Sequence, residues 1–226
     1  MSTIPKVYKS KFKERLSPEG FSLYRKTFYR VVNDVLQTLM LINHGTEYTV
    51  GFHIYPLYLG IWDLYIEGFG IHELREKNIF DSEKRWRNFN IFTGVKLSDE
   101  EVNSAVDEMI SLVVSHVLPI FERGKDWKSG YDEMEMFKKR IYGNKLYPPG
   151  ESRYYMYLKA KKYEKATAIA QYFVTINESW KSCYTFELEQ LLARNTAYFD
   201  NLLAEREAQA REYLTNPRKY KPKQGY

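Results

Sequence analysis

The segment from Gly20 to Ile61 constrains the fold most, because it is rich in aromatic and β-branched residues and polar turn residues divide it into short runs. Between Tyr48 and Tyr55 apolar and polar residues alternate, as they do in a half-buried antiparallel strand. The alternation predicts one face toward the core and a second, wetter face that carries His53 and Tyr55. Residues 57–64 are expected to add a further strand. The segment therefore predicts an antiparallel sheet of about four to five strands, with one face open to a partner.

Helical patterns flank this sheet on both sides. Apolar residues recur near helical spacing between residues 3 and 16, and the turn residues Ser17–Gly20 end that pattern. A capping-box pattern, Ser98-x-x-Glu101, begins the second half of the chain. The helical patterns that follow cover Val102–Phe121, Tyr131–Ile141, a hairpin over Glu151–Phe173 and a final helix over Tyr184–Leu214. The fold class is therefore α+β: an N-terminal helix, an antiparallel sheet and a helical C-terminal half.

One stretch of the helical half, Leu158–Ala166, resembles half of a tetratricopeptide unit. Such a unit cannot bury its own faces, and the sequence shows no second copy of it. We therefore interpret Glu151–Phe173 as an ordinary helical hairpin with a turn at Lys161-Lys162. In the final helix the apolar stripe fades after Leu203, so its last turns are expected to project into solvent.

The chain is long enough, at 226 residues, to bury a substantial core. We expect a single domain over residues 1–215, made of a helix-and-sheet part (1–97) and a helical part (98–215). The segment Gly143–Gly150 contains two adjacent prolines and is the expected boundary between subdomains. Residues 216–226 are expected to form a flexible basic tail.

The net charge of +5 is concentrated at the two ends. Residues 1–30 hold eight Lys or Arg against Glu14 and Glu19, and residues 216–226 hold four basic residues and no acidic one. A nucleic-acid-binding protein usually carries its basic face on the folded domain itself. Nucleic-acid binding through the basic ends is therefore the weaker hypothesis about a partner.

Cysteine content and hydropathy indicate a compartment. Cys183 is alone, which excludes an intramolecular disulfide and any zinc site built from several thiolates. No apolar run follows the lysine-rich start, and no apolar run reaches the 18–20 residues that span a bilayer. These features predict a cytoplasmic protein without a membrane partner.

Histidines and acidic residues offer a weak case for an enzyme. His72 lies beside Glu73 and follows Asp63 and Glu67, and imidazole and carboxylate groups are ligands for divalent metals. These spacings match no known ligand motif, and the sequence has no nucleophile elbow and no phosphate-binding glycine loop. We therefore assign no catalytic residue, metal or cofactor. A metal-dependent or small-molecule enzyme around His53 and His72 remains the alternative.

The expected first hairpin combines basic and aromatic residues. Arginine and tyrosine are enriched at protein interfaces, and the same combination can stack a single nucleic-acid strand. The candidate binding residues are those of this hairpin and of the wetter strand face: Tyr24, Arg25, Lys26, Arg30, His53 and Tyr55.

The pattern G-F-x-x-Y-R-K-x-F-Y-R from Gly20 to Arg30, followed by L-x-L-I-N and Y-T-V-G from Tyr48 to Gly51, resembles an uncharacterised family of bacterial domains of unknown function. The resemblance covers about 45 residues, and Phe52-His53-Ile54 departs from the family's pattern. It implies a sheet followed by helices and no known activity, and some such domains accompany toxin or secretion loci. The sequence thus predicts a non-enzymatic protein-binding or accessory module of bacterial type, such as an immunity-like protein, whose partner is another protein.

Overall fold

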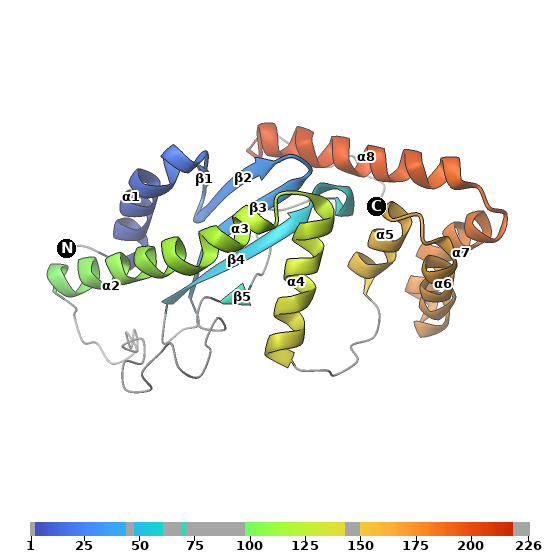
Figure 1. Ribbon diagram of the computed structural model, residues 1–226, viewed down its shortest axis with the longest axis horizontal. Coiled ribbons are helices and arrows are strands. Elements are labelled where there is room, and N and C mark those ends of the chain that lie inside the picture. Colours follow the sequence, from blue (N-terminus) through green and yellow to red (C-terminus); the bar gives the residue numbers. More distant parts are fainter. Residues whose placement is uncertain (1–2, 44–47, 61–68, 71–97, 143–149, 219–226) are drawn as a thin grey trace. The chain divides into compact units, whose positions relative to one another are not determined.

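The computed structural model describes residues 3–43, 48–60, 69–70, 98–142 and 150–218. The chain divides into two compact units (Figure 1). The sheet unit comprises residues 1–56 and 63–141, and the helical unit comprises residues 57–62 and 142–226. The division at residue 142 lies next to the segment 143–150 expected as a boundary, of which residues 143–149 are outside the described residues.

The sheet unit contains a five-stranded antiparallel sheet in which each strand pairs with its neighbour in sequence. The strands are β1 Ser22–Tyr24, β2 Thr27–Val32, β3 Val35–Asn43, β4 Tyr48–Pro56 and β5 Phe69–Gly70. The α+β class and the antiparallel sheet are confirmed. The strand expected over residues 57–64 is wrong in its described part, because Leu57–Leu59 form a 3-10 turn, η2, closed by a hydrogen bond from Gly60 N to Leu57 O of 3.0 Å.

Helices cover one face of this sheet, and α2 and α3 run across its strands in Figure 1. The core is formed by alternate residues of β3 and β4, such as Leu39 and Phe52, which are paired across the two strands. Phe28 on β2 and Phe12 on α1 extend the same cluster. The helices of this unit are α1 Ile4–Leu16, α2 Asp99–Leu112, α3 Leu118–Arg123 and α4 Trp127–Tyr142, with a π-helical turn Val113–Val117 between α2 and α3.

The predicted helix start at Ser98 is confirmed, because its side chain accepts from Glu101 N while the Glu101 carboxylate accepts from Ser98 N. Pro119 lacks an N–H group, so one carbonyl in the preceding turn has no ordinary helical donor. The helix responds by widening into the π turn, where Leu118 N donates to Val113 O. It then continues to Arg123 and ends at Gly124.

By length and composition alone, the continuous helix Asp99–Arg123 meets the requirements for a membrane span, with a mean hydropathy of 1.4 over its most apolar window. The sequence analysis expected no such segment. About 33% of that window is buried, and its inward residues, including Val106, Met109 and Phe121, belong to the sheet-unit core.

The second face of the sheet differs from expectation along the central strand. Leu36, Thr38 and Met40 point away from the helix-covered face, yet none is more than 2% exposed. Thr49 on β4 is also buried, at 3%. β3 is therefore buried on both faces and offers no open surface. A nearly continuous apolar run is typical of such strands.

The helical unit consists of η2 and four helices: α5 Glu151–Lys159, α6 Tyr163–Ile176, α7 Glu178–Leu192 and α8 Thr196–Thr215. The predicted hairpin over Glu151–Phe173 is confirmed as α5 and α6. The single final helix predicted over Tyr184–Leu214 is wrong, because the chain reverses at Arg194, whose φ is +54°. Asn195 then caps α8 by accepting a hydrogen bond from Tyr198 N at 3.4 Å.

The end of α8 is anchored rather than projecting into solvent. Arg206 donates hydrogen bonds to the carbonyls of Tyr58 (3.2 Å) and Leu59 (2.5 Å). Further along the helix Tyr213 and Leu214 are buried. The sequence analysis missed this because the contacts of α8 come from η2, nearly 150 residues earlier in the chain.

Candidate functional site

The tip of the first hairpin is the exposed part of the predicted binding surface. Arg25 and Lys26 form the tight turn between β1 and β2, and Arg25 has a φ of +56°. The Arg25 guanidinium lies 5.2 Å from the centre of the Tyr24 ring. Both residues of this contact belong to the hairpin itself. The tip is therefore a small basic surface formed by Arg25 and Lys26.

Arg30, by contrast, makes several contacts within the sheet unit. Its guanidinium donates to the Gln37 side chain (2.8 Å), to the Glu19 carbonyl (2.9 Å) and to the Glu122 carboxylate (3.1 Å). It also lies 4.8 Å from the centre of the Phe21 ring, and its side chain is only 11% exposed. Arg30 therefore joins the hairpin to α3 and has no remaining surface for a partner.

Gln37 extends this network into the core. It is fully buried, and its amide nitrogen donates to the carbonyls of Phe121 (2.7 Å) and Gly124 (3.3 Å) at the end of α3. A Cβ at Gly124 would lie 2.4 Å from the Ile54 Cδ1 atom and 3.2 Å from the Gly130 Cα atom, so the end of α3 packs closely against the sheet at this glycine. The basic-aromatic pattern of this hairpin is thus largely a packing pattern.

His53 and Tyr55 lie on β4, with ring centroids 5.7 Å apart. Burial lowers the pKa of His53 to about 4, and the positive charge of Lys138 acts in the same direction. His53 is therefore neutral near pH 7. In the sheet register His53 is level with Thr38 on β3, and three strand spacings, about 14 Å, separate β4 from β1. The six predicted binding residues consequently do not form one site.

A metal-dependent enzyme was the alternative based on His72 and the nearby acidic residues. His72, Asp63, Glu67 and Glu73 all lie outside the described residues. Within the described ranges, no three His, Cys, Asp or Glu side chains are arranged to hold a metal ion.

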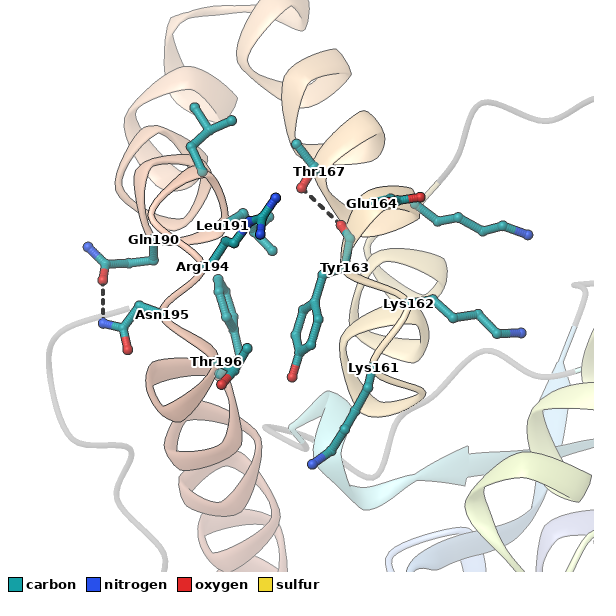
Figure 2. A pocket seen from close by; sticks show the side chains of 13 residues that line it. Lys161, Lys162, Tyr163, Glu164, Thr167, Gln190, Leu191, Arg194, Asn195 and Thr196 are labelled. Atoms are coloured by element: carbon teal, nitrogen blue, oxygen red, sulfur yellow. Dashed lines mark hydrogen bonds between the residues drawn. The ribbon is translucent and has the colours of Figure 1, made fainter.

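A cavity that the sequence analysis did not anticipate lies in the helical unit (Figure 2). It has a volume of about 800 Å³ and is bounded by the α5–α6 turn on one side and the α7–α8 turn on the other. Figure 2 shows Tyr163 and Arg194 directed into the gap between the two hairpins and Lys161 at its mouth. Lys162 and Glu164 point away from the gap. We call this space the inter-turn cavity.

The two turns that bound the inter-turn cavity have the same backbone structure. In the first, Lys161 N donates to Leu158 O and Lys162 N donates to Tyr157 O, at 2.9 and 2.8 Å. In the second, the equivalent bonds run from Arg194 N to Leu191 O and from Asn195 N to Gln190 O, both at 3.0 Å. This is the Schellman pattern of a helix C-terminus, in which one residue is left-handed.

The left-handed residues are Lys161 (φ +56°) and Arg194 (φ +54°), which are 33 positions apart. A sequence signal for this repetition exists: both turns read Leu, any residue, Ala, a basic residue. It was missed because glycine usually marks such turns and neither contains one.

A second cluster in the helical unit is polar and buried. The Tyr184 hydroxyl donates to the Glu151 carboxylate, and Tyr154 and Tyr155 pack edge-on at 5.1 Å between ring centroids. Burial raises the pKa of Glu187, and the hydroxyl of Tyr154 partly opposes this shift. Burial also raises the pKa of Tyr154, with Glu187 adding to the effect. The cluster therefore favours the protonated forms of Glu187 and Tyr154.

No family model, curated protein or solved structure matches this chain in the comparisons made. The resemblance to a bacterial family of unknown function therefore stays a prediction.

Proposed function

We propose that this chain is a non-enzymatic protein-binding module that contacts its partner through the α6–α7 pair of the helical unit. The observation that carries the proposal is the distribution of exposed apolar side chains. Among the described residues six large apolar side chains are exposed, and α6 and α7 hold four of them: Tyr172, Ile176, Phe186 and Leu192.

Their exposure is substantial, from 41% for Tyr172 and Ile176 to 54% for Phe186 and 64% for Leu192. Single exposed apolar residues are ordinary, but their concentration on one helix pair is typical of a protein-interaction surface. Aromatic side chains such as Phe186 and Tyr172 contribute strongly to interfaces. A partner with a complementary apolar surface would shield them from water.

The hairpin of the sheet unit supports this proposal less than the sequence suggested. Arg30 is enclosed by Gln37, Glu19 and Glu122, which leaves only the hairpin tip exposed. A cytoplasmic location and a bacterial, immunity-like role remain parts of the proposal that rest on sequence features alone.

The test is a comparison of matched variants in affinity capture from native extract, with cross-linking to identify the contacted chain. Ile176→Ser/Phe186→Ser should lose the captured protein, and cross-links should map to α6 and α7. Met136→Ser is the control, since Met136 is 53% exposed but lies on α4 of the sheet unit. Equal recovery by all three proteins, or cross-links confined to the sheet unit, would exclude α6–α7 as the interface.

A further inference from the structure

We propose that the inter-turn cavity binds a small organic anion: a phosphate or carboxylate group attached to an aromatic or apolar body. A volume of about 800 Å³ is in the range of small-molecule sites, which are generally apolar clefts with a few well-placed polar groups. The cavity lies on the same helix pair as the proposed protein interface and shares Leu192 with it, but its ligand is argued from charged and aromatic side chains that the interface proposal does not use.

The cavity lining includes four basic side chains, Lys161, Lys162, Lys165 and Arg194, and one acidic side chain, Glu164. Lys162 and Glu164 point away from the gap, whereas Arg194 and Lys161 stand on the two bounding turns (Figure 2). Within the part of the chain that the structure describes, the Arg194 guanidinium has no ion-pair or hydrogen-bond partner. Lys161 lies 3.8 Å from the Asp200 carboxylate, but both side chains are more than half exposed, so this pair contributes little. A guanidinium fork and an ammonium group are the usual partners of phosphate and carboxylate oxygens.

Two helix N-termini add to the positive potential. The first turn of α6 and the first residue of α8, Thr196, both line the cavity. No side chain caps α6, and Lys165 N donates to the Lys162 carbonyl at 3.1 Å. In α8 Asn195 is the cap, and Thr196 N donates to the Arg194 carbonyl at 2.9 Å. The dipoles of both helices still favour an anion and add to the charge of the basic side chains that line the cavity.

The backbone conformation of the two cations argues that they are there for a reason other than stability. Residues other than glycine pay a steric penalty in the left-handed region, and glycine is favoured at this position of a helix C-terminus. Both turns instead place a long cationic side chain there, and both side chains reach the same cavity. Strained residues of this kind cluster at ligand-binding sites, and the placement of both cations on one cavity supports a binding role for them.

The walls of the cavity suit the rest of the ligand. The ring of Tyr163 and the ring of Phe199 lie 6.4 Å apart between centroids. Leu192 adds an apolar side chain that is 64% exposed. An aromatic or branched apolar group can pack here while its charged group faces Arg194.

The experiment titrates the isotopically labelled full chain with phenyl phosphate, benzoate and inorganic phosphate, following backbone amide shifts by NMR. Phenyl phosphate or benzoate should shift the amides of residues 161–165 and 190–199, and inorganic phosphate should bind at least tenfold more weakly than the better of the two. The stronger of phenyl phosphate and benzoate identifies the charged group. Binding should weaken as salt is raised.

Arg194→Gly should reduce the affinity for the better probe at least tenfold while keeping the dispersed spectrum of a folded chain. Arg25→Gly is the matched control, because Arg25 has the same backbone conformation but lies in the sheet unit, and it should leave binding unchanged. If neither organic anion shifts the cavity amides at millimolar concentration, or if Arg194→Gly binds as tightly as the original chain, the inference is wrong.

Discussion

Arg30 and Arg194 show two opposite uses of the same side chain. Arg30 lies in the sheet unit, where three hydrogen-bond acceptors and an aromatic ring enclose its guanidinium. Arg194 lies in the helical unit, exposed at the edge of a cavity and held in a left-handed turn. Arg30, which lies beside aromatic residues in the sequence, thus has a structural role. Arg194, the cation at the cavity, lies in a turn that no common sequence motif marks.

The largest effect on stability is expected from removing Arg30. Arg30→Ala leaves the buried Gln37 side chain without one partner and removes the link to Glu19 and Glu122, so we expect a loss of about 2–4 kcal/mol in the free energy of unfolding. Chemical denaturation measures the loss, and hydrogen exchange should place it in β2, β3 and α3. Arg25→Ala serves as the control and should change stability by less than about 0.5 kcal/mol. Equal effects of the two substitutions would contradict the structural role of Arg30.

The second prediction uses the buried histidine of the sheet unit. The pKa of His53 is lowered to about 4 in the folded state, against an unperturbed value near 6.5, so the unfolded chain takes up the proton first as pH falls. The free energy of unfolding therefore keeps its full His53 contribution above pH 6.5. It falls by up to about 3 kcal/mol as the pH is lowered from 6.5 to 4.

Unfolding midpoints measured at intervals across this pH range test the prediction. His53→Gln should flatten the profile between pH 6.5 and 4. A variant whose midpoint falls with acid as steeply as that of the original chain would show that another group causes the dependence.

In the helical unit Glu187 should make stability depend on pH in the opposite direction, with a smaller effect. Burial raises the pKa of Glu187 above its unfolded value, so its contribution is favourable below the unfolded pKa and is lost as pH rises through the folded pKa. Glu187→Gln removes the ionisable group and should stabilise α7 at pH 8 while changing little at pH 4. Hydrogen exchange of α5 and α7 at both pH values measures this. Faster exchange in the variant at pH 8 would show that the ionised carboxylate supports the fold.

Local patterns in the sequence predicted much of the fold. The capping box at Ser98, the α5–α6 hairpin and the antiparallel sheet are set by residues close together in the chain, and all are confirmed. The errors arose where contacts between residues far apart in the chain determine the structure. The end of α8 is held by η2, and Arg30 is enclosed by Glu122, which lies 92 positions away.

The candidate cavity was missed for a related reason. The left-handed turn at Arg194 has no glycine, and the apolar stripe before and after it keeps a helical period, so the pattern indicated one continuous helix. Its equivalence with the turn at Lys161 is established by the backbone hydrogen bonds, and the short pattern that the two turns share is too common to have predicted it. The burial of both faces of β3 was, in contrast, indicated in the sequence by the nearly continuous apolar run after Val35, which only Gln37 and Thr38 interrupt.

The account depends most on the claim that Lys161 and Arg194 are kept in their turns at a cost to stability. The most direct test is the unfolding free energy of the double variant Lys161→Gly/Arg194→Gly. Glycine removes the steric cost of the left-handed conformation at both positions, but it also makes the unfolded chain more flexible. The net prediction is a free energy of unfolding about 1 kcal/mol higher than that of the original chain. A loss comparable to that of Arg30→Ala would mean that these two cations hold the helical unit together.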